Sequence, residues 1–266
     1  MQGELPIGPV SYAPPKAMSP SSIGTFDQCP MKFKFSRLDR IEEDTTEPQV
    51  RGNYVHEVLE LLLKLDQKDR NLPSALAISR NLWFEKYKEL FEAIPNHGPA
   101  NDFQWTSRWC IENYFNMEDP ETIPSESDGT VGLEWKVDGE VNGVPMRGIV
   151  DRWQKEDDNR VRVIDYKTGK VPAPRFEFEK KMQLMIYVDL LQQELDLDVS
   201  VAQLYYVKSG KVVDYVPSAP LLKVVKESVA ETWVDVQSSC ASGEFETKTG
   251  PLCNWCSFKP HCPAWG

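Results

Sequence analysis

The sequence lacks several features, and each absence excludes a class of protein. No run of about 18–20 apolar residues occurs, so we expect no transmembrane helix. The first residues show no basic start followed by an apolar run, so we expect no secretory signal. Basic residues number 30 against 41 acidic ones, and this net charge of −11 excludes a generally basic nucleic-acid coat. A local basic groove remains compatible with it, because attraction depends on where the charges lie.

The six cysteines are the next constraint. Because nothing in the sequence directs export, we expect a cytoplasmic chain with reduced thiols and no membrane partner. A disulfide framework is then disfavoured, and metal binding or simple burial is the better interpretation. The chain also has no GxxxxGK[ST] loop, which excludes a built-in helicase motor.

The first half of the chain has the periodicity of helices. Residues 1–17 are rich in proline and predict an extended arm. Ser19 is expected to cap the first helix, which Pro30 interrupts. Apolar spacing then predicts three helices, over Gly52–Leu65, Ser74–Ala93 and Asp102–Phe115. The segment from there to residue 130, rich in proline and acids, is expected to be a loop.

From Val131 the apolar period changes to two, which predicts strands. The expected elements are strands Val131–Val137, Val144–Asp151 and Arg160–Lys167, a helix Phe176–Leu195, a hairpin of Val199–Val207 and Lys211–Val216, and a helix Pro220–Ser239. Three successive strands with short turns cannot all be parallel, because a parallel pair needs a crossover of about a dozen residues. The predicted fold class is therefore α/β, with a mixed sheet flanked by helices.

The predicted organisation is one integrated domain in four parts. Residues 1–17 form the arm, 18–130 a helical part, 131–242 the sheet with its helices, and 243–266 a cysteine-bearing tail. Within the helical part, Lys32–Arg40 carries four basic residues and two phenylalanines against one acid. Such a mixture is a candidate nucleic-acid contact, and an ordinary solvated face is the competing interpretation.

Charged residues gather where the predicted strands end. Asp165 and Lys167 are two apart on one strand, so their side chains point to the same face. If this strand pairs with the preceding one, Asp151 lies close to Asp165. Two carboxylates and a lysine suit a hard cation such as Mg²⁺ or Mn²⁺ and the phosphate chemistry that it supports. A surface ion pair is the alternative, but the apolar strand Val161–Ile164 leading into the cluster favours a site.

Two helical pairs accompany this cluster. His56 lies four residues before Glu60, so both can share one helix face. Imidazole beside carboxylates would favour Mn²⁺ over Mg²⁺, and a purely structural histidine is the alternative. Gln183 and Tyr187 have the same spacing on the helix Phe176–Leu195, whose apolar residues are expected in the core.

These observations combine into a series of four motifs. In order they are Gly52-x-x-x-His56-x-x-Leu59-Glu60, Gly148-Ile149-Val150-Asp151-Arg152, Asp165-Tyr166-Lys167-Thr168-Gly169 and Gln183-x-x-x-Tyr187. Each is weak alone, but the four in this order resemble the RecB-like branch of the PD-(D/E)XK nuclease superfamily. The resemblance spans about half of the chain. Val150 stands where proline gives the superfamily its name, a departure that is common in this branch.

The resemblance implies a restriction-endonuclease-like core and a role for each motif. The metal ligands that it implies are His56, Asp151, Asp165 and the backbone carbonyl of Tyr166. The residues of the catalytic motifs are Asp151, Asp165, Lys167, Gln183 and Tyr187. Among these, Lys167 would be the catalytic lysine, whereas Gln183 and Tyr187 would lie near the DNA strand or the site. Glu60 would support the site without binding the metal.

The C-terminal cysteines Cys253, Cys256 and Cys262 form a C-x2-C-x5-C run. A zinc ribbon would normally supply a second C-x2-C pair, which the chain lacks, so a fourth ligand must come from elsewhere. The candidates by sequence alone are Cys29, Cys110, Cys240 and His261. Among them, Cys110 lies between aromatic residues of a predicted helix and is expected to be buried.

The resemblance implies which cysteine is the fourth. In iron–sulfur members of the branch, including the CRISPR-associated RecB-like exonucleases and the AddB nuclease domain, one cysteine upstream of the histidine motif joins three at the C-terminus. Cys29 with Cys253, Cys256 and Cys262 is similar to that pattern. It implies a structural four-iron, four-sulfur (4Fe-4S) cluster, with a structural zinc site as the competing interpretation.

Taken together, the resemblance implies a divalent-metal-dependent DNA exonuclease. Single-stranded DNA is the expected substrate, because no groove-reading motif appears and aromatic residues lie near basic ones. The expected partners are DNA and proteins of recombination, repair or CRISPR adaptation. Two other functions compete with this one. The first is a catalytically inactive DNA-binding or assembly module of the same fold, and the second is a cysteine-ligated zinc protein without nuclease activity.

Overall fold

A computed structural model describes residues 11–173 and 177–265 of the chain. These residues group into two compact units, each assembled from separate stretches of sequence. The sheet unit comprises Asp44–Val137 and Gly148–Leu222. The cysteine unit comprises the described residues of Met1–Glu43, Asp138–Arg147 and Lys223–Gly266. The first ten positions of the predicted arm, and Phe176 at the predicted start of a helix, lie outside the described residues.

Five strands form one mixed sheet in the order β1-β2-β3-β4-β5. They are β1 (Val131–Val141), β2 (Val144–Lys155), β3 (Arg160–Lys167), β4 (Asp198–Tyr206) and β5 (Lys211–Tyr215). Strand β2 pairs antiparallel with β3, β3 parallel with β4, and β4 antiparallel with β5. The parallel pair is joined through helix α7 (Glu177–Leu195), the crossover that parallel pairing requires. The prediction of an α/β fold with a mixed, helix-flanked sheet is confirmed.

Strand β2 differs from its prediction in one respect that matters for the site. The strand was expected to end at Asp151, but it continues to Lys155. The continuation is paired, because Arg152 lies opposite Ile164 of β3 and Lys155 opposite Val161. Asp151 therefore lies inside a strand that continues on both sides of it.

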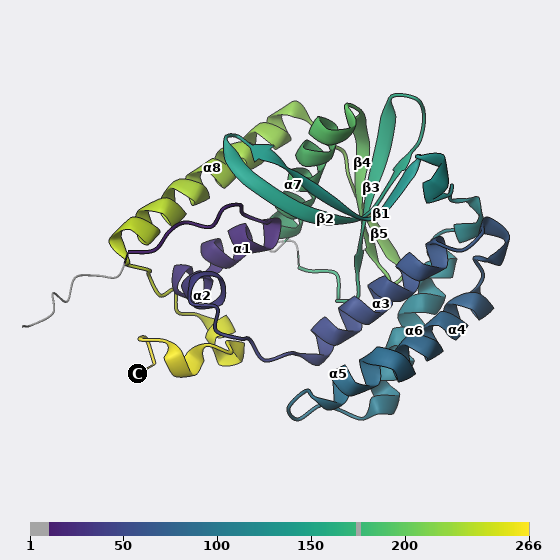
Figure 1. The fold of residues 1–266 in the computed structure, drawn as a ribbon, viewed down its shortest axis with the longest axis horizontal. Coiled ribbons are helices and arrows are strands. Elements are labelled where there is room, and N and C mark those ends of the chain that lie inside the picture. Colours follow the sequence, from purple (N-terminus) through teal and green to yellow (C-terminus); the bar gives the residue numbers. More distant parts are fainter. Residues whose placement is uncertain (1–10, 174–176, 266) are drawn as a thin grey trace, which may run out of the picture. The chain divides into compact units, whose positions relative to one another are not determined.

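The helices of the sheet unit pack together beside the sheet (Figure 1). They are α3 (Glu47–Leu63), α4 (Leu72–Leu82), α5 (Lys88–Glu92) and α6 (Ala100–Met117), with a π-helical turn η3 (Trp83–Tyr87) between α4 and α5. Asn71 caps α4 by accepting a hydrogen bond from the Ser74 backbone N–H. The apolar faces of these helices share one core with Ile164 and Tyr166 of β3 and with Tyr205 of β4.

Short 3₁₀ helices complete the sheet unit, at η2 (Gln67–Asp69), η4 (Pro120–Thr122) and η5 (Glu126–Asp128). The last two lie in the segment that was expected to be a loop. None of the helices within the described ranges is long and apolar enough to cross a membrane.

The cysteine unit is built from short helices and most of one long helix. They are α1 (Pro20–Gln28), α2 (Pro30–Phe33), the π-helical turn η1 (Lys34–Leu38), α8 (Ala219–Ser242), η7 (Pro251–Trp255) and η8 (Lys259–His261). Ser19 caps α1 through a reciprocal pair of hydrogen bonds with Ser22, as the sequence predicts. Pro30 ends that helix and occupies the first turn of α2, where a missing N–H costs nothing.

A buried ion pair ties strand β2 to the end of helix α6. The guanidinium of Arg152 is fully buried and donates to both carboxylate oxygens of Glu118, over 2.7 and 2.8 Å. Its other side lies over the ring of Tyr166, 5.7 Å from the ring centre. Because each charge has lost its water, the pair depends on keeping both members.

We therefore expect Glu118→Gln to lower the free energy of unfolding by about 3 kcal/mol, because the substitution leaves the buried Arg152 charge uncompensated. Urea denaturation of the purified chain measures this change. Glu112→Gln is the matched control, since Glu112 pairs with Arg108 on the exposed surface of α6, and it should cost less than about 1 kcal/mol. Equal losses in the two variants would contradict the structural role given to Arg152.

Candidate functional site

The predicted carboxylates meet where β2 and β3 pair. The paired residues Arg152 and Ile164 directly adjoin Asp151 and Asp165, so these two acids lie side by side. Ile164 contributes to the helical core, and the alternation of a strand turns Asp165 to the other face. There Lys167 places its Nζ atom 2.6 Å from Asp165 Oδ2. The expectation that Asp165 and Lys167 share one face is confirmed.

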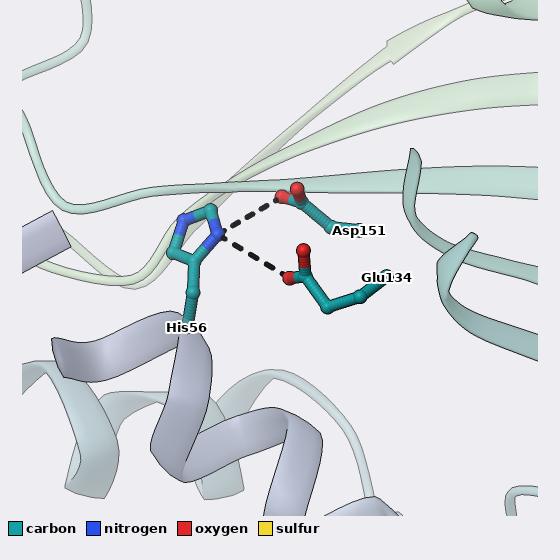
Figure 2. A group of neighbouring side chains, drawn as sticks. All are labelled: His56, Glu134 and Asp151. Atoms are coloured by element: carbon teal, nitrogen blue, oxygen red, sulfur yellow. Dashed lines mark ion pairs between the residues drawn. The ribbon is translucent and has the colours of Figure 1, made fainter. Parts of the chain in front are cut away.

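Helix α3 brings His56 to these paired strands. Its Nδ1 atom lies 3.5 Å from Asp151 Oδ2 and 4.0 Å from Glu134 Oε1. Figure 2 shows the same ring nitrogen facing both carboxylates. One ligand atom from each of the three residues lies within 4.8 Å of the others, a spacing suited to a shared metal ion. The structure thus joins His56 to Asp151, as the motifs predict, and adds Glu134.

The second nitrogen of His56 orients the ring. Nε2 lies 2.8 Å from the backbone carbonyl oxygen of Tyr166. Because a carbonyl can only accept, Nε2 carries the hydrogen in the neutral ring and Nδ1 presents its lone pair to the carboxylates. The Asp151 carboxylate is held in turn, accepting a hydrogen bond of 2.7 Å from the Tyr166 backbone N–H. The Tyr166 carbonyl is therefore engaged with His56, and its role as a metal ligand stays a prediction.

Sequence reasoning missed Glu134, which lies on β1. Its backbone has a φ of 44°, in the left-handed region that few residues other than glycine adopt. The preceding residue, Leu133, packs with Leu63 of α3, while Glu134 itself reaches His56 of the same helix. Successive residues of a regular strand would face opposite sides, so the irregular backbone is what turns Glu134 to the site. In the sequence, Glu134 is a single acid in a strand pattern of period two, and nothing in that pattern indicates that its side chain turns to the site.

Helix α7 covers the site with the predicted pair Gln183 and Tyr187. The amide of Gln183 donates to the hydroxyl of Tyr187 over 3.4 Å. The Tyr187 ring lies on the backbone of β2 at Gly148, where a Cβ atom would come within 2.5 Å of a ring carbon. Glycine at this motif position thus gives the ring room. Glu60 is not in the metal-suited group, and its carboxylate pairs with Lys64 over 2.6 Å.

Burial and neighbouring charges shift the pKa values of His56, Asp151 and Glu134. Burial alone would lower the pKa of His56, but the charges of Asp151, Asp165 and Glu134 outweigh it and raise that pKa to about 9. Burial would raise the pKa of Asp151, yet the facing His56 and Lys167 hold it below its ordinary value. Burial and the adjacent Asp151 raise the pKa of Glu134 to about 7.

Burial and neighbouring charges also shift the pKa values of Asp165 and Lys167. Burial raises the pKa of Asp165, with Lys167 opposing and Asp151 reinforcing that rise. Burial would lower the pKa of Lys167, but the charges of Asp165 and Asp151 raise it. Lys167 therefore stays protonated at neutral pH.

The donor set fits a divalent cation. Mn²⁺ binds both imidazole nitrogens and carboxylate oxygens, whereas Mg²⁺ prefers the carboxylate oxygens. The repulsion between Asp151 and Glu134, visible in the raised pKa of Glu134, is what a cation between them would relieve. A cavity of about 580 Å³, lined in part by His56, Glu134 and Asn53, adjoins the group and offers space for a substrate.

The cysteines form a second candidate site, within the cysteine unit. All four cysteines of the predicted set line one cavity of about 190 Å³: Cys29, Cys253, Cys256 and Cys262. Across the described residues, no three of these sulfur atoms lie within 4.8 Å of one another. The Gly250 backbone N–H donates to Cys253 Sγ over 3.3 Å. Cys110 and Cys240 are fully buried outside this cavity, so the burial expected for Cys110 is confirmed.

The pKa of His56 generates a prediction for metal binding. A cation must displace the proton that His56 holds up to about pH 9, so the affinity for Mn²⁺ should rise about tenfold per pH unit from pH 7 to pH 9 and level off above. Below the pKa of Glu134, about 7, a second proton should steepen the dependence. Titration calorimetry measures both the affinity and the protons released.

The control for this titration is His97→Gln, which alters an exposed histidine outside the group and should leave the curve unchanged. His56→Gln should remove the rise between pH 7 and pH 9. A pH-independent affinity in the unmodified chain would contradict the assignment of His56 as a ligand.

Comparisons with known proteins show which sequences the chain is similar to. The chain is 24% identical to the Gene 69 protein of Mycobacterium phage D29, covering 92% of this chain and 96% of that protein. The Gene 69 protein of Mycobacterium phage L5 is 22% identical, with 92% and 95% covered. One of the subunits of an ATP-dependent helicase/deoxyribonuclease from Streptococcus agalactiae is 24% identical over 69% of this chain but only 17% of that protein.

The fold and the family model point the same way. A crystal structure described as a candidate exonuclease from Eubacterium rectale shares the fold, with a TM-score of 0.57, 13% identity, and 91% of this chain and 87% of that chain covered. The model of the PD-(D/E)XK nuclease superfamily matches residues 17–263, which include all four motifs and the cysteines. The chain therefore belongs to the PD-(D/E)XK nuclease superfamily, in its RecB-like branch.

Proposed function

We propose that the chain is a divalent-metal-dependent exonuclease that hydrolyses single-stranded DNA. The observation that carries this proposal is the convergence, where β2 and β3 pair, of His56, Asp151 and Glu134 with the Lys167–Asp165 pair. The descriptions of two similar proteins support hydrolysis of DNA as the reaction. One protein is a subunit of a helicase/deoxyribonuclease, and the other is described as a candidate exonuclease.

The metal would be held by His56, Asp151 and Asp165, and Glu134, which lies beside His56 and Asp151, would be a further ligand. Bound there, a divalent cation would polarise the scissile phosphate and lower the pKa of an attacking water. The chain's own part is to hold these ligands rigidly. Asp151 and Asp165 lie on paired strands, and His56 is oriented by the Tyr166 carbonyl.

Lys167 would act on the phosphate as a fixed positive charge. Its pKa is raised by Asp165 and Asp151 against the effect of burial, so it donates hydrogen bonds and does not accept a proton at neutral pH. A cation placed before the reaction begins stabilises the charge that develops on phosphate oxygens. Tyr187, which lies over Gly148 of β2, and its hydrogen-bond partner Gln183 would help to position the DNA strand.

Lys167→Ala tests the assignment. We expect it to lower the rate of cleavage of end-labelled single-stranded DNA in Mn²⁺ by about 100-fold or more, because it removes a preorganised charge from the reacting phosphate. Lys170→Ala is the matched control, since Lys170 is exposed, three residues further along, and outside the Asp165 ion pair; it should cleave normally.

Gel analysis of the products separates the outcomes of that experiment. Mononucleotides from the first time points onward support an exonuclease, whereas internal fragments would contradict that part of the proposal. Equal cleavage by Lys167→Ala and the unmodified chain would place the activity elsewhere. No cleavage by any of the three proteins would favour an inactive DNA-binding or assembly module.

We propose further that Cys29, Cys253, Cys256 and Cys262 hold a 4Fe-4S cluster. Their convergence on one cavity supports a shared ligand. A structural zinc site, held by the same thiolates, is the competing ligand. The N–H that faces Cys253 Sγ is of the kind that tunes cluster sulfurs.

The cluster can be tested by its colour and composition. Protein purified without oxygen should be brown, with iron and sulfide in equal amounts, and Cys253→Ser should lose the visible absorbance. Cys240→Ser alters a buried cysteine outside the cavity and should keep it. A colourless protein with one zinc ion per chain would contradict the cluster.

A further inference from the structure

A second hollow in the cysteine unit is lined by several basic residues. It has a volume of about 680 Å³ and is lined by the segment from Tyr12 to Ser19, by residues of α1, α2 and η1, and by Arg147 of β2. The charged residues of its lining are Lys16, Arg37, Arg40 and Arg147. Among the residues that the structure describes, no acid lines it, although the chain as a whole has 41 acidic and 30 basic residues.

Backbone hydrogen bonds hold one wall of this basic hollow in place. The Tyr12 N–H donates to the carbonyl of Cys240 in α8 over 2.8 Å. At the other end of the wall, Met18 donates to Pro145, and Arg147 donates back to Met18, both over 2.8 Å. Lys16 and Arg147 are therefore carried on ordered backbone, which reduces the entropy lost when they bind an anion.

Within the described residues, the three arginines of the lining have no acidic partner. The acid nearest to them in sequence, Asp39, is bound by Lys34 over 2.5 Å. In the described part of the chain, no hydrogen bond or ion pair joins the side chains of Arg37, Arg40 or Arg147 to an acid. All three arginines are exposed, so the fold does not need them for packing.

Bringing four positive charges together costs free energy because they repel one another, and no acid among the described lining residues offsets that cost. An external anion would. Guanidinium groups present a planar pair of N–H donors that matches the oxygens of a phosphate. Because several such groups surround one hollow, they match a chain of several phosphates better than they match a single phosphate group.

We propose that this hollow binds the phosphodiester backbone of a DNA strand, through Arg37, Arg40, Arg147 and Lys16. The inference rests on the proposed function for the identity of the polyanion, and it adds a contact to the substrate that lies outside the metal centre. Contacts of this kind hold a strand without reading its sequence. They also reconcile DNA binding with a net charge of −11, because the positive charge is local.

Binding in EDTA tests the hollow without cleavage. The probe is a fluorescent oligothymidylate of about 20 nucleotides, long enough for a single-strand binding site. Anisotropy at several salt concentrations gives the slope of log K against log salt, which is about −0.7 for each phosphate contact on a single strand. Arg37→Gln and Arg147→Gln should each flatten the slope by about 0.7 and weaken binding about fivefold near 0.1 M salt.

Lys68→Gln is the matched control. It removes one positive charge from an exposed residue that is not part of the hollow's lining, and should leave the slope unchanged. Urea denaturation of each variant confirms that it folds. Arginine variants that behave like Lys68→Gln would overturn the proposal.

Two further outcomes separate this inference from its alternatives. If the unmodified chain binds vesicles of phosphatidylglycerol but not the oligonucleotide, the hollow recognises lipid phosphate and the proposal is wrong. If it binds the oligonucleotide through these arginines but does not cleave it in Mn²⁺, the hollow is supported and the proposed exonuclease activity fails.

Discussion

The antiparallel pairing of β2 with β3 is the constraint on which the rest of the site depends. It places Asp151 beside Asp165 on one face of the sheet, while Arg152 and Tyr166 extend into the core on the other. The Asp151 carboxylate accepts the Tyr166 N–H, so one hydrogen bond joins the two motifs directly. Because the strands are rigid and the buried Arg152–Glu118 pair fixes β2 to α6, the acids stay together despite their repulsion.

The repulsion between these acids is a property that suits the site to binding a cation. His56 has a pKa of about 9 and Glu134 one of about 7 because negative charge is concentrated around them in a partly buried place. A protein that stores such repulsion gains affinity for a cation. The cysteine unit shows the opposite concentration, of basic residues around one hollow. An acidic chain can thus offer one site that attracts a metal and another suited to phosphates.

Much of the fold could be predicted because its signals are local. The change of apolar period at Val131 marks the start of β1, and Ser19 with Pro30 marks the ends of α1. Two features could not be predicted in this way. Strand β2 continues past Asp151 because its residues pair with β3, which is a long-range contact. Glu134 joins the site through a left-handed backbone that strand periodicity cannot reveal.

The sequence by itself determined the four motifs, their order, and the residue types that suit a metal and a phosphate. It did so because the chemistry of carboxylates, imidazole and lysine, and the spacing of strands and helices, are properties of short segments. Only the tertiary structure decided which ring nitrogen of His56 faces the acids, that Glu134 stands with them, and that Arg147 joins Arg37 and Arg40 around one hollow. Each of these depends on residues far apart in the chain, whose meeting is set by packing and by strand register.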